Sequence, residues 1–171
     1  ELVFVTGPAQ IAAPDGVQVV PVETAQQMLE AVESALPADA AVCAAAVADW
    51  RVVSPAVHKM KKQKDVAPQL AFEENPDILA RISQHSKDRP ALVVGFAAET
   101  DDLLENATAK RQRKGCDWIV ANDVSPDTGI MGGDENAVTL ITDAGPECWP
   151  RAPKHQVAAR LARRIAETLQ S

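Results

Sequence analysis

The feature that most constrains the fold is the alternation of short apolar segments with longer amphipathic segments along the chain. The apolar segments predict strands at residues 2–8, 17–22, 40–48, 91–100 and 117–123, and a turn–strand–turn unit at 129–145. The amphipathic segments predict helices at residues 24–36, 75–84, 101–115 and 154–169. This order predicts an α/β protein with a three-layer α/β/α architecture, a mostly parallel sheet and helices on both faces.

Several local signals refine these elements. The segment Ala40–Ala48 is apolar throughout, which favours a central strand covered on both faces, although its alanine content also fits a helix. Thr24 can cap the first helix, and Asn75 is predicted to cap the second, with Pro76 at its first helical position. Gly115 is predicted to end the third helix, and a short strand is predicted near residues 70–72.

Composition limits the class of protein. The 171 residues fit one domain, and no apolar run approaches the ~18 residues of a membrane span. The net charge of −7 disfavours general binding to nucleic acid. Cys43, Cys116 and Cys148 lack the spacing of a zinc site or a disulfide framework. With no signal-peptide pattern at the start, these observations predict a cytoplasmic protein that does not interact with membranes.

The positive charge is concentrated despite the acidic total. Nine of the 17 Lys and Arg residues lie in two segments, 51–64 and 110–114. One interpretation is two solvated faces, and the other is two walls of a cleft that binds a polyanion. Lys110 shares a helical face with Lys114, as does Arg111, so either pair could meet phosphate oxygens. The Pro-flanked loop 54–68 is predicted to be a lid that an anionic ligand orders.

Polar residues follow three predicted strands and are expected to face one crevice at the carboxyl edge of the sheet. These residues are Asp49, Glu99, Thr100, Asn122 and Asp123. Asp49 has a structural interpretation, as a turn or cap residue, and two functional ones, as a hydrogen-bond acceptor for a ribose or base or as a metal-linked carboxylate. The three histidines are interpreted as surface residues, and Gly132–Gly133 as part of a hairpin turn rather than a phosphate loop.

Six blocks then carry a resemblance that covers nearly the whole chain. "AAVADWR", "HKMKKQK", "NPDIL", "GFAAET", "KRQRKGCDWIVANDVS" and "GDENAVTLIT" occur in this order. The chain closely resembles phosphopantothenoylcysteine synthetase, the ligase half of a bifunctional coenzyme A biosynthesis flavoprotein. The resemblance implies a homodimeric enzyme with a Rossmann- and ribokinase-like fold. It joins L-cysteine to 4′-phosphopantothenate with CTP and Mg²⁺ through an acyl-cytidylate. It also implies fusion to, or association with, a flavin-dependent decarboxylase.

The matching blocks imply roles for individual residues. Asp49 is expected to contact cytidine, with the backbone of Cys43, Ala44 and Ala45 lining the nucleotide pocket, and Ala46 is expected at the acyl-cytidylate. Lys59 is expected at the phosphates and in catalysis. The remaining nucleotide-binding residues implied by the resemblance are Pro76, Asp77, Ile78 and Leu79 around the triphosphate, Phe96 against the nucleotide, and Lys110 and Lys114 in a basic wall. Metal ligands are not assigned.

One departure from the family pattern concerns the start of the chain. The family opens with a further strand and a Gly-rich loop that supply an Asn and an Arg for substrate binding, and residues 1–171 are interpreted as a single ligase domain without them. The resemblance therefore implies that this chain alone lacks part of the active site. Two rival interpretations are a nicotinamide-dependent oxidoreductase, which needs the G-x-G-x-x-G that "VTGPAQ" does not supply, and a non-catalytic module that binds nucleic acid or a partner.

Overall fold

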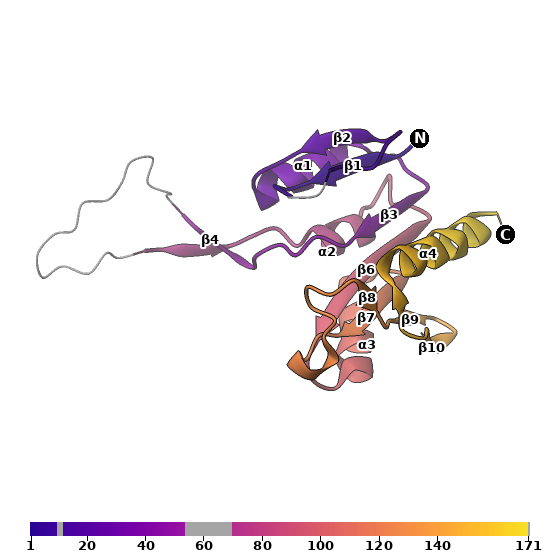
Figure 1. Cartoon of the computed structure of the whole chain (residues 1–171). Coiled ribbons are helices and arrows are strands. Elements are labelled where there is room, and N and C mark those ends of the chain that lie inside the picture. Colours follow the sequence, from indigo (N-terminus) through magenta and orange to yellow (C-terminus); the bar gives the residue numbers. More distant parts are fainter. Residues whose placement is uncertain (10–11, 54–69, 171) are drawn as a thin grey trace, which may run out of the picture. The chain divides into compact units, whose positions relative to one another are not determined.

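The computed structural model describes residues 1–9, 12–53 and 70–170, which fall into two compact units (Figure 1). Unit 1 comprises Glu1–Ala31 and Ala45–Asp77, and unit 2 comprises Val32–Ala44 and Ile78–Ser171. The chain therefore passes between the units more than once, and each unit contains segments that are distant in sequence.

Unit 1 opens with a parallel strand pair and a helix. Strands β1 (Val3–Thr6) and β2 (Gln18–Pro21) pair in parallel, and helix α1 (Ala25–Ser34) follows, with residues 25–31 in unit 1 and 32–34 in unit 2. The Thr24 hydroxyl accepts a hydrogen bond from the backbone N–H of Gln27 at 3.1 Å. The Gln27 side chain in turn accepts one from the backbone N–H of Thr24 at 3.1 Å, which completes a capping box. The predicted cap at Thr24 is therefore confirmed.

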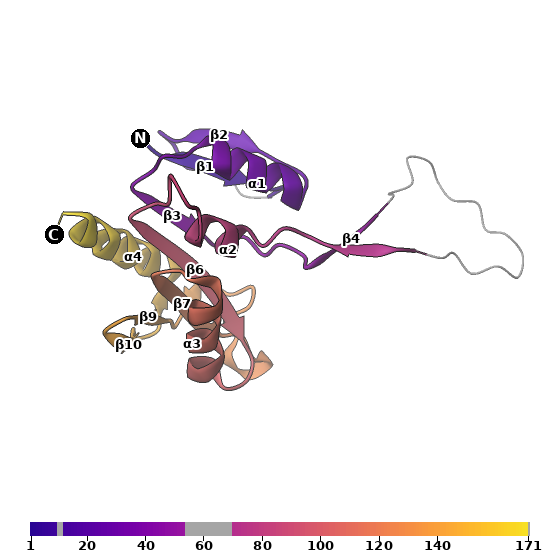
Figure 2. The same cartoon turned by 180° about the vertical axis from the view of Figure 1, so that it is seen from behind.

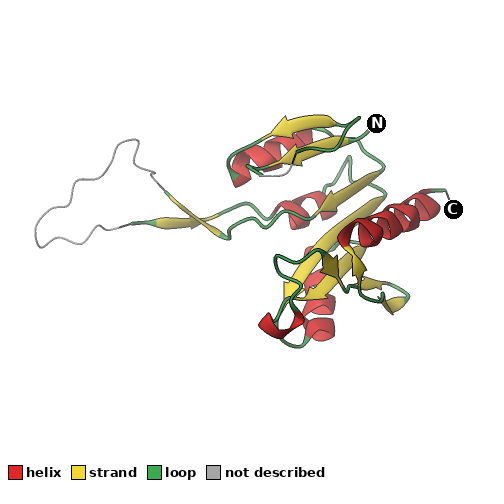
Figure 3. Ribbon diagram, viewed as in Figure 1, coloured by secondary structure: helices red, strands yellow, loops and turns green. Residues whose placement is uncertain are grey.

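A two-stranded antiparallel ribbon completes unit 1 (Figure 3). Strand β4 (Trp50–Val52) pairs with β5 (Phe72–Glu74), close to the short strand predicted near residues 70–72. At its base the Asn75 backbone N–H donates to the Asp49 carbonyl at 2.7 Å, and the Asn75 side chain donates to the Ala48 carbonyl at 2.8 Å. The predicted helix cap at Asn75 is wrong, because these bonds use its amide to close the ribbon and the next helix begins only at Ile78.

Unit 2 is built on a five-stranded sheet in the order β10-β9-β7-β6-β3. The strands are β3 (Ala40–Cys43), β6 (Leu92–Glu99), β7 (Trp118–Asp123), β9 (Thr139–Thr142) and β10 (Gly145–Cys148). The pairs β3–β6 and β6–β7 are parallel, whereas β7–β9 and β9–β10 are antiparallel.

The sheet of unit 2 is therefore mixed, and the prediction of a mostly parallel sheet is wrong for it. The reason is the connections after β7, because a parallel neighbour needs a long crossover that is usually helical. The segment between β7 and β9 carries only the 3₁₀ turn η1 (Pro126–Thr128) and the short strand β8 (Glu135–Asn136), and two residues join β9 to β10.

Strand β3 also departs from its prediction. It ends at Cys43, lies at the end of the five-stranded sheet, and pairs there only with β6. Val42 is 48% exposed, whereas a central strand covered on both faces would bury it. The apolar run over 44–48 forms no regular element, so the predicted nine-residue central strand is a four-residue terminal one.

Helices cover both faces of this sheet, as predicted (Figures 1 and 2). On one face Leu161 of α4 (Lys154–Leu169) joins a core cluster with alternate residues of β6, β7 and β9, namely Leu92, Val94, Trp118, Val120 and Leu140. The intervening residues point to the opposite face, where α2 (Ile78–Ser83) and α3 (Leu103–Lys114) lie. This alternation produces the three-layer α/β/α architecture.

Helix α4 is fastened to the sheet edge by an aromatic and ionic contact. The Arg160 guanidinium lies 4.3 Å from the ring centroid of Trp149, which is 4% exposed, and also pairs with Glu147 of β10 at 2.7 Å. Partial desolvation opposes ionisation of Glu147, but the hydrogen bond from Arg160 and the charges of Arg164 and Arg160 hold its pKa below the usual value.

Gly95 allows α2 to approach the sheet. A Cβ atom at this position would lie 2.5 Å from Cδ2 of Leu79 and 2.9 Å from Cδ1 of Ile119. Only a residue without a side chain fits between α2 and the β6–β7 pair at this distance, so this glycine sets the packing of the second helical layer.

We expect Gly95→Ala to lower the free energy of unfolding by about 1–3 kcal/mol, because the added methyl overpacks a filled core. Urea denaturation would measure this, with Gly7→Ala as the matched control, since the nearest atom to a Cβ there is 3.9 Å away. Truncating Leu79 to Ala in the Gly95→Ala background should give a cost smaller than the sum of the two single changes. Strict additivity would contradict the proposed contact.

Candidate functional site

The carboxyl ends of β6 and β7 lie next to each other in unit 2. The parallel register pairs Ala98 with Asn122 and Glu99 with Asp123, and the Val124 backbone N–H donates to the Glu99 carbonyl at 2.9 Å. The Asn122 side chain also donates to Asn136 at 3.3 Å. The prediction that these strand ends share one edge is therefore confirmed for β6 and β7.

Asp123 is held in a fixed orientation at this edge. Its Oδ1 accepts hydrogen bonds from the Ser125 hydroxyl and from the Ser125 backbone N–H, the latter at 2.8 Å. Both bonds favour the charged form of the Asp123 carboxyl and so lower its pKa from the ordinary value. The bond from the Ser125 hydroxyl has the larger effect. The side chain is therefore a carboxylate at neutral pH.

A cavity of about 440 Å³ opens beside Asp123, within unit 2. Its polar lining consists of Asp123, Asp127, Thr128, Thr139, Cys148 and Arg151. Its apolar lining includes Ile130, Val138 and Trp149, each at most 5% exposed. Of these residues, the sequence pointed only to Asp123 as a site residue. Val138 and Thr139 lie in the block GDENAVTLIT, to which the sequence assigned no role beyond the family resemblance.

Asp49 does not lie at the end of a strand. It follows β3 by six residues, belongs to unit 1, and its carboxyl group is exposed. Its backbone carbonyl accepts the bond from Asn75 at the base of the β4–β5 ribbon. The prediction that Asp49 directly follows a strand, as Asn122 and Asp123 do, is therefore wrong. The contact predicted between Asp49 and a nucleotide stays a prediction.

The other residues with predicted nucleotide contacts fall into two groups. Cys43 is half-buried at the end of β3, while Ala44, Ala45 and Ala46 are exposed and form no regular element. In contrast, Ile78 and Leu79 are 8% and 9% exposed, so their side chains belong to the core of unit 2.

Three further predictions concern Phe96, the Pro76–Asp77 pair and Lys59. Phe96 is partly buried and packs against the core cluster beneath α4. Pro76 is half-buried and Asp77 exposed, directly before the first residue of α2. Lys59 and the predicted lid 54–68 lie outside the described residues.

Helix α3 separates the basic cluster of residues 110–114 into two classes. Arg111 is turned toward the protein, with a side chain only 16% exposed that donates to the Asp117 carbonyl at 2.6 Å and pairs with Asp143. The interpretation of Arg111 as a phosphate-facing residue is therefore wrong, because this side chain joins α3 to the loop before β7. Lys110 and Lys114 lie four residues apart, on successive turns of the helix, and both are half-buried.

The family of the chain follows from its sequence. The profile of the DNA/pantothenate metabolism flavoprotein C-terminal domain matches residues 1–169. The chain belongs to this family. Among curated proteins, it is 34% identical over 171 residues to the coenzyme A biosynthesis bifunctional protein CoaBC of Vibrio parahaemolyticus, and 38% identical over 161 residues to that of Escherichia coli K12. These matches cover 99% and 92% of this chain but only 43% and 39% of the relatives.

Solved structures give the same assignment for the domain. The C-terminal domain of a CoaBC protein is 33% identical, with a TM-score of 0.77 over 98% of this chain and 74% of that chain. A family structure from Streptococcus pneumoniae is 15% identical, with a TM-score of 0.75 over 97% of this chain and 80% of that chain, so it supports the fold alone. The Rossmann-like character that the sequence predicted is thus confirmed for this family member.

Within residues 1–9, 12–53 and 70–170, no group of three or more His, Cys, Asp or Glu side chains is placed to hold a metal ion. None of the helices in the same ranges is long and apolar enough to cross a membrane.

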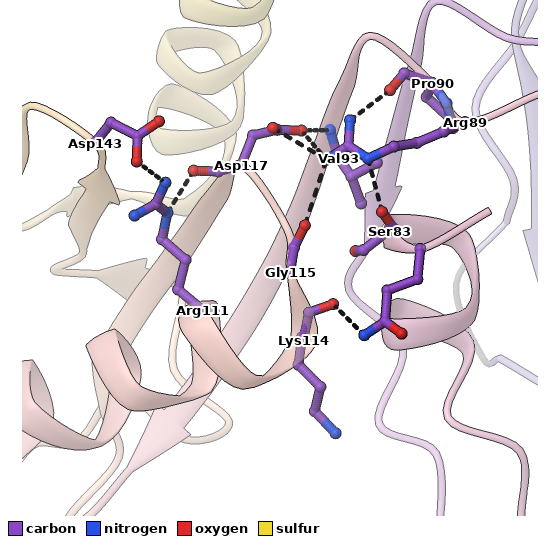
Figure 4. A network of polar contacts seen from close by, with 10 residues as sticks. Ser83, Arg89, Pro90, Val93, Arg111, Lys114, Gly115, Asp117 and Asp143 are labelled. Atoms are coloured by element: carbon purple, nitrogen blue, oxygen red, sulfur yellow. Dashed lines mark hydrogen bonds and ion pairs between the residues drawn. The ribbon is translucent and has the colours of Figure 1, made fainter. Parts of the chain in front are cut away.

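An ionic network fixes the end of α3 in this family member (Figure 4). Arg89 binds both carboxylate oxygens of Asp117, at 2.9 and 3.0 Å, and also donates to the backbone carbonyls of Ser83 and Gly115. The Asp117 carboxylate accepts a further bond from the Val93 backbone N–H at 2.6 Å. One carboxylate thereby joins the ends of α2 and α3 to the starts of β6 and β7.

The same network determines where α3 ends. Gly115 takes a left-handed conformation with φ 73°, and its N–H donates to the Arg111 carbonyl, which confirms the predicted stop. The Lys114 backbone carbonyl accepts a hydrogen bond from Gln84 at 3.5 Å, while its side chain extends away from the network in Figure 4. The backbone that carries the two lysines is therefore held from several sides.

We expect Asp117→Ala to lower the free energy of unfolding by about 2 kcal/mol, because charge-assisted bonds to Arg89 and the Val93 N–H are lost together. Urea denaturation would measure this. Asp143→Ala is the control, since its ion pair with Arg111 involves a carboxyl that is 95% exposed and should contribute less than about 1 kcal/mol. Equal losses in the two variants would argue against a central role for Asp117.

Proposed function

We propose that this chain is the ligase part of a coenzyme A biosynthesis enzyme, joining L-cysteine to 4′-phosphopantothenate at the expense of CTP. The observation that carries the proposal is family membership over residues 1–169, together with identity of 34% and 38% to two CoaBC proteins. A related structure that supports it is a Cab2 variant in complex with phosphopantothenate-cysteine, 18% identical with a TM-score of 0.62 over 88% of this chain.

The proposed reaction has two steps with balanced bonds. A carboxylate oxygen of phosphopantothenate attacks the α-phosphorus of CTP, the bond from that phosphorus to the bridging oxygen breaks, and pyrophosphate leaves. The cysteine amine then attacks the acyl carbon of the acyl-cytidylate, the bond to the CMP oxygen breaks, and the amine loses a proton. Both steps bring anions together, so they require cations and fixed positions more than a side-chain nucleophile.

In unit 2, Lys110 and Lys114 are proposed to supply part of that positive charge. They occupy i and i+4 positions of α3, and the Asp117 network holds the end of this helix. The backbone that carries the two side chains is therefore fixed in position. We further propose that the backbone at Cys43 and Ala44, the first turn at Ile78 and Leu79, and Phe96 contact the nucleotide. Since Ile78 and Leu79 are buried, only their backbone groups are available for this.

In unit 1, Asp49 is proposed to recognise cytidine, and Ala45, Ala46, Pro76 and Asp77 to lie against the nucleotide or the acyl-cytidylate. Lys59 is proposed to contact the phosphates during catalysis. Mg²⁺ is usually held by one or two carboxylates and the substrate phosphates, and we propose that it enters with CTP. Its chemistry would be to neutralise charge on the departing pyrophosphate.

The test of the function is pyrophosphate release from CTP, Mg²⁺ and phosphopantothenate in the absence of cysteine, measured with the full protein that contains this chain. We expect one equivalent of pyrophosphate and a bound acyl-cytidylate, followed by CMP release when L-cysteine is added. Failure to form pyrophosphate while NADPH stabilises the protein thermally would favour the oxidoreductase interpretation instead.

We expect Lys110→Gln and Lys114→Gln each to raise the KM for CTP about tenfold, because one charge-assisted contact to phosphate is removed. Steady-state kinetics at varied CTP would measure it. Arg113→Gln is the matched control, since Arg113 is exposed on the same turn. An unchanged KM in both lysine variants would remove these residues from the nucleotide site.

We also propose that the active protein is a homodimer, and the β4–β5 ribbon supports this. On one of its faces Trp50, Val52 and Phe72 lie together, with Glu74 opposite Trp50, and Trp50 and Phe72 are 57% and 58% exposed. The other face carries the Arg51–Glu73 ion pair at 2.9 Å. An exposed aromatic face opposite a charged one is typical of an association surface.

We expect the double variant Trp50→Ser, Phe72→Ser to raise the dimer dissociation constant at least tenfold, because two aromatic side chains no longer gain burial. Sedimentation velocity over a concentration series would measure it. Leu104→Ser is the control, an apolar residue 47% exposed on α3. An unaltered dimer in the double variant would place the interface elsewhere.

A further inference from the structure

The cavity in unit 2 is lined by charged groups of both signs. Asp123 and Asp127 contribute two carboxylates, and Arg151 contributes the only guanidinium among its described lining residues. Its volume of about 440 Å³ lies within the range of small-molecule sites. It opens at the carboxyl end of β7, the edge at which open α/β sheets bind ligands.

Asp123 offers one oriented acceptor to the cavity. Its Oδ1 is used by the two bonds from Ser125, whereas no donor among the described residues binds its Oδ2. Because Ser125 both orients the group and keeps it ionised, Oδ2 is a fixed anionic acceptor. Ammonium groups are the donors that such an acceptor binds most strongly.

Arg151 offers the complementary donor. Its Nε pairs with Glu135 at 2.8 Å and its Nη1 donates to the Thr128 carbonyl at 2.8 Å. No acceptor among the described residues binds its Nη2. Two bonds therefore hold the guanidinium in place while one edge stays available for a carboxylate.

This arrangement selects among ligand classes. A polyanion would meet two carboxylates and one arginine whose charge is already shared with Glu135, so repulsion would oppose it. A small molecule with one ammonium and one carboxylate satisfies both available groups. The apolar part of the lining, Ile130, Val138 and Trp149, can contact a short apolar side chain of the ligand.

We propose that this cavity binds a small α-amino acid as its zwitterion, with the ammonium at Asp123 and the carboxylate at Arg151. The inference rests on the proposed function, in which L-cysteine is the amino acid consumed. It assigns to this substrate a set of residues that has no other role in the proposed function. A free amino acid acting as an effector would use the same chemistry, and kinetics distinguish the two sources.

Three small molecules test separately the predicted contact of the ammonium group with Asp123 and that of the carboxylate with Arg151. L-cysteine carries both charged groups, cysteamine lacks the carboxylate, and 3-mercaptopropionate lacks the amine. Titration of each into the ¹⁵N-labelled chain, under reducing conditions and without nucleotide, should shift the backbone resonances of residues 123–128 and 148–151 with L-cysteine. Cysteamine should bind about tenfold or more weakly, and 3-mercaptopropionate should not produce these shifts.

Two variants assign the groups. Asp123→Asn should weaken L-cysteine and cysteamine alike by about tenfold, whereas Arg151→Gln should weaken L-cysteine by a similar factor and leave cysteamine unchanged. A loss of loop structure would instead weaken both probes in both variants and would alter the spectrum of the free protein. Asp15→Asn, an exposed carboxyl in unit 1, is the matched control and should change neither.

Steady-state kinetics of the full protein complete the test. A rise in the KM for cysteine in both variants, with the KM for CTP unchanged, would identify the substrate subsite; loss of binding with an unchanged KM would identify an effector site. Absence of shifts at 123–128 and 148–151, or equal binding of all three probes, overturns the proposal. Absence of pyrophosphate formation with CTP and phosphopantothenate overturns the ligase function instead and leaves the titration result standing.

Discussion

The pairing of β6 with β7 is the constraint on which the rest of unit 2 depends. Residues 92–95 of β6 and 118–121 of β7 are buried on both faces, so each of them is committed to one helical layer or the other. Gly95 supplies the space that α2 needs on one face, while the cluster around Trp118 receives α4 on the other. Because the pairing is parallel, the same register brings Glu99 and Asp123 together at one edge.

Charge in this domain serves two separate purposes. One purpose is structural. The hydrogen bonds of Arg89, Arg111 and Asp117 join the ends of helices to the starts of strands, at the opposite end of β7 from the cavity. Lys110 and Lys114 lie on the helix that this network fixes, and they are the residues proposed to supply cations for the anionic substrates. Within one basic run of the sequence, Arg111 is thus held by protein groups while the two lysines carry only a proposed ligand role, because a helix presents successive residues in different directions.

The two units differ in how their surfaces are used. Unit 2 has an apolar core that packs against its own helices, whereas the β4–β5 ribbon of unit 1 leaves two aromatic side chains, Trp50 and Phe72, exposed on one face. A two-stranded ribbon has no third layer to cover such a face, so burial must come from another surface. The homodimer and the amino-acid subsite are therefore proposals about different parts of the chain, and either can hold without the other.

The sequence by itself determined the helices and strands with strong periodicity, since α4 and the ends of α1 and α3 follow from apolar spacing, a capping box and Gly115. It also determined the family, because six ordered blocks are specific where single motifs are not. Only the tertiary structure decided that β3 is terminal and the sheet mixed, that Asn75 closes a ribbon instead of capping a helix, and that Arg111 turns inward. The physical reason is that pairing direction, strand order and side-chain partners depend on residues far apart in the chain, for which local propensity carries no information.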